Sequence, residues 1–205
     1  MFLSFDGIDG VGKSTQLQLT AGWLEGLGYE VTCCRDPGST RLGESIREII
    51  LNDKQLPVSL RSEMLLYMTA RAQLVAEIIQ PAMELGQVIL SDRFLLSNVV
   101  YQGHAGGLDP AEIWETGLVA TGGVLPDLSI VLNMDLPEAM ARLGEDKDRM
   151  ESRGEEFFGR VQAGFLHEAE RDPESVQVVD AAGSQQEVQL RVQEIVQQQL
   201  QASTM

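Results

Sequence analysis

A glycine-rich segment near the start of the chain has the residues needed to bind a polyphosphate. It reads Gly7-Ile8-Asp9-Gly10-Val11-Gly12-Lys13-Ser14 and fits the pattern G-x-x-x-x-G-K-[ST], with Thr15 directly after it. Glycines let backbone N–H groups turn towards phosphate oxygens, and the following helix presents its positive N-terminus to the same anion. Lys13 can neutralise the β- and γ-phosphates, and the Ser14 hydroxyl can bind magnesium. The segment predicts a nucleoside triphosphate site over residues 7–15; the alternative is a glycine-rich turn with a chance lysine.

A pair of charged residues follows another apolar segment. Val88–Ser91 reads as a strand, and Asp92 and Arg93 come directly after it. The carboxyl edge of a parallel sheet forms its ligand crevice, so Asp92 could hold the magnesium ion there, directly or through water. The side chain of Arg93, the next residue, points in a different direction from that of Asp92. It could reach a phosphate group that lies between the phosphate donor and the phosphate acceptor. The alternative is a solvent-exposed pair that caps a helix over residues 93–102.

Short apolar strands alternate with helical segments along the chain. The predicted strands are Phe2–Phe5, Glu30–Cys34, Val88–Ser91, Leu128–Asn133 and Val176–Val179. The predicted helices are Thr15–Leu27, Gly43–Asn52, a long stretch Leu60–Leu85, Pro110–Ala120, Pro137–Leu143, Glu155–Arg171 and Gln185–Leu200. This alternation is typical of an α/β fold in which helices cover both faces of a parallel sheet. The length of 205 residues suits one such domain, and no composition break divides it.

The excess of acidic over basic residues limits the kinds of molecule that the protein can bind. There are 31 acidic residues against 15 lysines and arginines, a formal charge of −16. Such a field repels nucleic acid polymers and anionic membranes, so a phosphate site must rest on a few bases gathered in one place. Apolar runs are interrupted well before the roughly 18 residues that a membrane span needs.

Cys33 and Cys34 are adjacent in a strand expected to be buried, where they point to opposite faces and cannot form an ordinary disulfide. Reduced thiols suit a cytoplasmic protein.

The phosphate-binding segment alone does not decide the function, because many nucleotide hydrolases share it. A small-molecule kinase with a dedicated acceptor pocket competes with a regulatory GTPase or partitioning ATPase. A guanine-specific switch should carry Asn-Lys-x-Asp and an Asp-x-x-Gly after the magnesium strand, but that strand leads into Asp92-Arg93-Phe94. A partitioning ATPase usually has a second lysine early in the loop, where Ile8 and Asp9 stand. These features favour the kinase.

Further segments support a specific resemblance. They are Phe5–Gln16, Arg35-Asp36-Pro37-Gly38-Ser39-Thr40, Asp92-Arg93-Phe94 with Ser97, Tyr101-Gln102-Gly103, and Asp148-Arg149-Met150-Glu151. In this order and spacing, up to about Ala169, they resemble the bacterial thymidylate kinases. The resemblance implies one P-loop kinase domain over residues 1–205 with a three-layer P-loop NTPase fold and a five-stranded parallel sheet. It also implies a homodimer and Mg²⁺-dependent transfer of the ATP γ-phosphate to dTMP, with another P-loop nucleoside-monophosphate kinase as the alternative.

The resemblance also implies roles for individual residues. It makes Lys13, Arg93, Asp9 and Arg149 the catalytic residues, and Ser14 and Asp92 the magnesium ligands. The dTMP site comprises Asp36, Pro37, Tyr67, Arg71, Arg93, Asn98, Tyr101 and Gln102. Within it, Tyr67 stacks on thymine and Arg71, one turn later on the same helix, reads the base. Without the resemblance, a core-edge tyrosine and a solvated arginine on an amphipathic helix would be the simpler interpretation.

The sequence departs from the family pattern in several places. Asp6 and Asp36 stand where glutamate is usual, Ser39 replaces a glycine and Tyr67 replaces a phenylalanine. A lid expected over about residues 143–154 is short and has fewer arginines than usual. The loop offers no arginine for the transferring phosphoryl group, since positions 10 and 11 are glycine and valine.

The missing arginine is therefore expected from the lid. Arg149 is the first candidate because it lies in the part that best matches the family, with Arg153 and Arg142 behind it. The alternative is that these bases merely offset neighbouring acids on a solvated loop. His104 and His167 are isolated in the sequence and receive no predicted role.

Overall fold

The fold is a five-stranded parallel sheet, as the sequence predicts. The computed structural model describes residues 1–53, 55–142, 144 and 149–202; residues 54, 143, 145–148 and 203–205, and with them part of the expected lid, lie outside the described chain. Across the sheet the strands run in the order β2 (Val31–Arg35), β3 (Val88–Asp92), β1 (Phe2–Asp6), β4 (Leu128–Asn133) and β5 (Val176–Asp180). Every neighbouring pair is parallel, and each strand lies within one residue of its predicted bounds.

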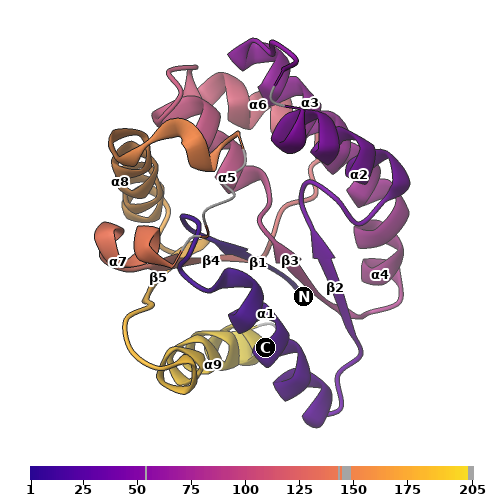
Figure 1. Cartoon of the computed structure of the whole chain (residues 1–205). Coiled ribbons are helices and arrows are strands. Elements are labelled where there is room, and N and C mark those ends of the chain that lie inside the picture. The colour runs from indigo at the N-terminus through magenta and orange to yellow at the C-terminus, as the bar shows by residue number, and fades with distance from the viewer. Residues whose placement is uncertain (54, 143, 145–148, 203–205) are drawn as a thin grey trace.

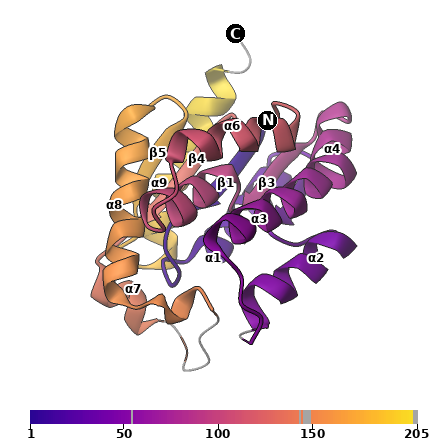
Figure 2. The same cartoon turned by 90° about the horizontal axis from the view of Figure 1, so that it is seen from above.

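Helices cover both faces of the sheet (Figure 1). The α-helices are α1 (Lys13–Gly26), α2 (Arg41–Arg47), α3 (Leu60–Leu74), α4 (Gln80–Glu84), α5 (Leu95–Asn98), α6 (Pro110–Thr121), α7 (Leu136–Ala141), α8 (Glu155–Arg171) and α9 (Gln185–Ala202). One face carries α1 and α9, and the other carries α3, α5, α6 and α8. Figure 2 shows α3 and α6 side by side over the sheet. The three-layer arrangement is therefore confirmed.

Short turns of other helix types interrupt or extend several helices. They are the π-helical turns η1 (Glu48–Asn52), η2 (Val75–Ile79) and η3 (Val99–His104), and the 3₁₀ turn η4 (Glu151–Arg153). The predicted long stretch Leu60–Leu85 thus consists of α3, η2 and α4. The helical segment formed by α5 and η3 is not among the predicted helices and enters only through the alternative of a helix over residues 93–102. Its residues are buried on most sides and show no apolar stripe.

Two apolar clusters anchor the layers to the sheet. Leu3 and Phe5 of β1 belong to the cluster that contains Leu17 and Leu24 of α1. Phe2 belongs to the other cluster, built from residues of η2, α3, α5 and α6. Because successive residues of a strand point to opposite faces, neighbours on β1 serve different layers.

The prediction of a buried cysteine strand is wrong for most of β2, in which Cys34 alone of the five residues is buried. β2 is an edge strand, and Cys33 is exposed whereas Cys34 is buried. Both are free thiols, as predicted. Among the described helices, none has the length and hydropathy needed to cross a bilayer.

The register of the sheet brings the functional segments together at one edge. Phe5 pairs with Asp92, and Arg35 on the other side of β3 also pairs with Asp92. The loops that leave β1, β2 and β3 therefore start side by side at the carboxyl edge, where open parallel sheets bind ligands.

Candidate active site

The phosphate-binding loop between β1 and α1 has a backbone that only glycine fits at two positions. A Cβ on Gly7 would lie 2.4 Å from the Leu132 carbonyl oxygen, and one on Gly10 would lie 2.2 Å from that of Ala139. Both also have positive φ angles, 131° and 86°, which L side chains rarely adopt. The loop is thus pressed against β4 and α7, and its shape depends on these glycines.

Lys13 and Ser14 start α1 and face the carboxyl edge of the sheet. Lys13 Nζ donates to the Ile8 carbonyl at 2.7 Å and to Asp9 Oδ1 at 3.3 Å. Ser14 Oγ donates to Asp92 Oδ2 at 2.5 Å. The two predicted magnesium ligands, from segments 78 residues apart, therefore meet. A hydroxyl and a carboxylate side by side are hard oxygen ligands that fit Mg²⁺.

Arg93 lies between the loop and η3 in an unusual backbone conformation. Its φ is 68°, a left-handed conformation that costs of the order of 1 kcal/mol or more in a residue with a side chain. The guanidinium donates to the Gly7 carbonyl at 2.8 Å and to Ser97 Oγ at 3.2 Å, and it forms an ion pair with Asp9. It also lies over the Tyr101 ring, 5.1 Å from the centroid. These contacts hold the strained residue in place.

Charges in the loop are tightly coupled. Burial alone would raise the pKa of Asp9, but the Arg93 guanidinium and then the Lys13 ammonium more than offset it and hold that pKa well below its usual value. Burial, together with Arg93, lowers the pKa of Lys13, against the effect of Asp9. For Arg93 the penalty of burial is exceeded by the attraction of Asp9, so its pKa is raised. Asp9 thus balances two cations that would otherwise repel each other.

Two adjoining pockets open at this edge. One is lined by the phosphate-binding loop and bases around it, and we call it the donor pocket: Asp9, Gly10, Gly12, Lys13, Ser14, Thr15, Arg35, Asp36, Arg47, Asp92, Arg93 and Arg142. The acceptor pocket is lined by Asp9, Asp36, Pro37, Arg47, Leu51, Tyr67, Arg71, Arg93, Phe94, Ser97, Asn98, Tyr101, Gln102 and Met150. All eight residues predicted for dTMP lie in the acceptor pocket.

Arg71 is buried rather than solvated. Its side chain is only 2% exposed, and Nε donates to Asp36 Oδ2 at 2.6 Å. The simpler interpretation of a surface arginine is therefore wrong. Burial raises the pKa of Asp36, against the opposing effect of Arg71. The second carboxylate oxygen, Asp36 Oδ1, is buried and has no hydrogen-bond partner within the described part of the chain.

A chain of hydrogen bonds runs from Arg71 through the wall of the acceptor pocket. Arg71 Nη1 donates to Asn98 Oδ1 at 3.0 Å, Asn98 Nδ2 to Gln102 Oε1 at 2.7 Å, and Gln102 Nε2 to Glu63 Oε1 at 2.9 Å. Arg153 closes the chain with an ion pair to Glu63 at 2.6 Å. The network fixes the polar side chains of η3 and α3 in relation to one another.

Asp6, one of the two departures from glutamate, lies beneath the pockets rather than in them. It is buried and accepts hydrogen bonds from Ser4 Oγ at 2.7 Å and from Ser97 Oγ at 2.6 Å. Because Ser97 in turn accepts from Arg93, Asp6 supports the position of Arg93 through one intermediate.

The three arginines predicted to act from a lid occupy three different places. Arg142 lines the donor pocket and pairs with Glu138 at 2.7 Å. Arg149 instead donates to the carbonyls of Asp53 and Leu56, the latter at 2.8 Å. Neither Arg149 nor Arg153 lines the donor pocket in the described structure. Of the three, only Arg142 is positioned beside the phosphate-binding loop.

The sequence assigned no site role to five residues of the acceptor pocket, Arg47, Leu51, Phe94, Ser97 and Met150, or to Arg35 of the donor pocket. Arg47 is the most informative of them because it lines both pockets and donates to the Pro37 carbonyl at 3.1 Å. In so acidic a chain each lysine or arginine is a candidate phosphate ligand. On that ground Arg47 could have been predicted from the sequence.

Comparisons with known proteins show the family of the whole chain. The family model described as "Thymidylate kinase" matches residues 5–192. The thymidylate kinase of Leifsonia xyli is 45% identical over 92% of this chain and 90% of its own, and that of Pelotomaculum thermopropionicum is 43% identical over 93% and 90%. The crystal structure of thymidylate kinase from Ehrlichia chaffeensis superposes with a TM-score of 0.77 at 29% identity, covering 96% of this chain and 98% of that one. The fold is therefore the P-loop NTPase fold, and the chain belongs to the thymidylate kinase family.

Proposed function

We propose that the protein transfers the γ-phosphoryl group of ATP to dTMP and releases dTDP, a precursor of dTTP. The observation that carries this proposal is that the donor and acceptor pockets share four residues, Asp9, Asp36, Arg47 and Arg93. A shared wall with two arginines is suited to a phosphoryl group that passes from one pocket to the other. A regulatory nucleotide hydrolase has no need of a second pocket there.

Phosphoryl transfer needs positioning and charge stabilisation rather than a covalent intermediate. Lys13, now held by Ile8 and Asp9, would turn to the β- and γ-phosphates. Arg93 and Arg47 would bind the phosphates on either side of the shared wall. Ser14 and Asp92 would hold Mg²⁺, which neutralises phosphate charge when it is bound. Arg142, which lines the donor pocket, would stabilise the charge that develops during transfer.

The acceptor pocket suits a pyrimidine nucleotide. Tyr67 offers an aromatic ring, and Arg71, Asn98 and Gln102 form a fixed polar row for the base and sugar. Asp36 Oδ1, which is buried and has no hydrogen-bond partner among the described residues, can accept one more hydrogen bond, which a hydroxyl or N–H of the bound nucleotide would supply. The 5-methyl group of thymine adds one carbon to uracil, so we expect dTMP to be preferred to dUMP by about 10–200-fold.

Assembly and location are also proposals. The adjacent helices α2, α3 and α6 expose apolar side chains, among them Leu42, Leu65 and Leu118, with Val119 84% exposed. Such residues favour a homodimer through these helices. The free thiols suit the reducing cytoplasm.

A coupled assay with dTMP, dUMP, dCMP, UMP and AMP as acceptors tests the function. We expect dTMP to give the highest kcat/KM, with the purine nucleotide poor. A higher kcat/KM for UMP, dCMP or AMP would favour another nucleoside-monophosphate kinase. Nucleotide hydrolysis that none of the five stimulates would favour the regulatory class instead.

A further inference from the structure

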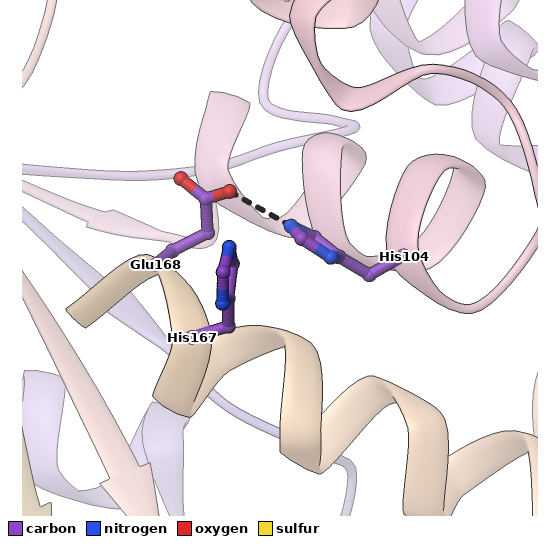
Figure 3. Close-up of side chains that lie close together, drawn as sticks. All are labelled: His104, His167 and Glu168. Atoms are coloured by element: carbon purple, nitrogen blue, oxygen red, sulfur yellow. Dashed lines mark hydrogen bonds and ion pairs between the residues drawn. The ribbon is translucent and has the colours of Figure 1, made fainter. Parts of the chain in front are cut away.

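Two histidines that are far apart in the sequence lie together against a buried glutamate (Figure 3). His104 ends η3, whereas His167 and Glu168 are neighbours on α8. The two imidazole rings meet edge to face with centroids 5.1 Å apart, and His104 Nε2 lies 2.8 Å from Glu168 Oε1. One ligand atom from each residue lies within 4.8 Å of the other two. The two histidines, isolated in the sequence, are therefore neighbours in the fold.

A close approach of α8 to η3 creates this cluster. At Gly164 a Cβ would lie 2.8 Å from the His104 Cβ and 3.0 Å from Val100 Cγ1. Residues three apart share one side of a helix, so His167 projects from the same side of α8 as Gly164. The absence of a side chain at position 164 thus lets α8 bring His167 over His104.

Partners on its far side hold the glutamate in a fixed orientation. Glu168 Oε2 accepts hydrogen bonds from Arg171 Nη2 at 2.6 Å, Arg171 Nε at 3.0 Å and Trp114 Nε1 at 3.3 Å. Oε1 is left facing His104. Outer partners of this kind orient carboxylate ligands in metal sites. His167 is exposed and, within the described part of the chain, makes no hydrogen bond, so its ring nitrogens are available.

We propose that His104 Nε2, a ring nitrogen of His167 and Glu168 Oε1 bind a borderline divalent cation, with Zn²⁺ the best fit. Two imidazoles and a carboxylate, with water in the fourth position, match the ligands of Zn²⁺, whereas Mg²⁺ prefers oxygens alone. Zinc bonds of about 2.0–2.2 Å in a tetrahedron require ligand atoms about 3.4 Å apart. The three ligand atoms now lie within 4.8 Å of one another, so side-chain rotations that widen the 2.8 Å contact between His104 and Glu168 and adjust His167 would give that spacing. The cation replaces the proton between His104 and Glu168, which moves to His104 Nδ1 or to solvent.

This site is separate from the magnesium site of the kinase reaction. None of its three residues lines the donor or the acceptor pocket. Its occupancy can therefore be measured without nucleotide, and the result does not depend on the proposed function.

The test uses the full chain, freed of metal by a chelator and without nucleotide. Zn²⁺ is titrated by calorimetry in excess Mg²⁺, which occupies oxygen-ligand sites, and Co²⁺ is titrated by visible absorption as a spectroscopic substitute. We expect one equivalent bound with micromolar or tighter affinity and the intense visible band of tetrahedral Co²⁺. His167→Gln, at an exposed position, should weaken binding at least about tenfold and lose the band. Cys33→Ser, which removes the exposed thiol as a competing ligand, should bind as the unmodified chain does.

Two results would overturn the proposal. One is the absence of saturable Zn²⁺ binding below about 1 mM in the folded chain, an affinity too weak for a built site. The other is a His167→Gln variant that binds Zn²⁺ like the parent, which would place any bound zinc elsewhere. His104→Gln gives a second reading, and circular dichroism of each variant separates loss of a ligand from loss of fold.

Discussion

Arg71 Nε donates to Asp36 Oδ2 at 2.6 Å, and these two buried side chains line the acceptor pocket. Arg71 belongs to α3, whereas Asp36 follows β2, so the pair joins a covering helix to the carboxyl edge of the sheet. Arg71, which we propose reads the base, is thus held in position before a nucleotide enters, so the proposed binding role would be coupled to a structural one.

Replacing Arg71 should affect the acceptor far more than the donor. We expect Arg71→Ala to raise the KM for dTMP at least about tenfold with little change for ATP, since the guanidinium lies at the acceptor pocket alone. It should also lower the free energy of unfolding by about 3–5 kcal/mol, because Asp36 is left buried without its partner. Steady-state kinetics and urea unfolding measure the two effects.

The double variant Asp36→Asn, Arg71→Ala is the matched control for that experiment. It should recover part of the lost stability, because no uncompensated charge stays buried, while dTMP binding stays weak. Equal losses for ATP and dTMP in the single variant would contradict the pocket assignment.

Arg47 should matter for turnover because it lines both pockets. We expect Arg47→Ala to lower kcat at least about tenfold, since arginines at a transferring phosphoryl group contribute 10³–10⁵ in related enzymes. Arg41, exposed on the same helix, provides the control, and Arg41→Ala should retain normal kcat. A normal kcat for Arg47→Ala would show that Arg47 does not contribute to phosphoryl transfer.

The lid arginines should differ according to their positions. Arg142→Ala is expected to lower kcat at least about tenfold, because Arg142 lies beside the phosphate-binding loop. Arg149→Ala should have a smaller effect on kcat, since Arg149 is engaged with the carbonyls of Asp53 and Leu56. Single-turnover rates of the two variants give the order directly. A larger loss of rate in Arg149→Ala than in Arg142→Ala would contradict this expectation. It would favour Arg149 as the arginine that acts in transfer, as the sequence predicts.

The two thiols should be labelled at very different rates, and both rates should depend on pH. Burial, with a contribution from Glu25, raises the pKa of Cys33 above the ordinary 9.0, and burial raises that of Cys34 to about 12. Because the thiolate is the reactive form, a raised pKa means slow labelling at pH 7 and a rate that climbs as pH passes 9. Maleimide labelling of the native chain should therefore modify Cys33 alone. Cys33→Ser should resist labelling until urea unfolds it, and rapid native labelling of that variant would show that Cys34 is accessible.

The sheet and the phosphate-binding loop follow from local pattern, and the sequence predicts them well. Each strand is a short apolar run that can be recognised in the sequence. The spacing of the residues from Gly7 to Ser14 identifies a phosphate-binding loop. The helical segment over residues 95–104 gives no such signal, because tertiary burial on several sides hides the helical period. Its residues Asn98, Tyr101 and Gln102 were found through the family resemblance instead.

Other features depend on contacts that no local pattern contains. His104 and Glu168 lie 64 residues apart in sequence and meet only because α8 packs on η3 at Gly164. Arg142 and Arg149 lie only seven residues apart in the sequence, yet of the two only Arg142 lines the donor pocket. Distances of this kind come from how the layers pack rather than from any one segment.

The fate of the γ-phosphate is the most direct test of the central claim, that the two pockets form one phosphoryl-transfer site. The chain is mixed with γ-labelled ATP, Mg²⁺ and dTMP, and the products are separated after a single turnover. We predict that the label appears in dTDP and not in free phosphate, and that Lys13→Ala, folded as judged by circular dichroism, forms neither product at a measurable rate. Label released as inorganic phosphate at the same rate with and without dTMP would contradict the account.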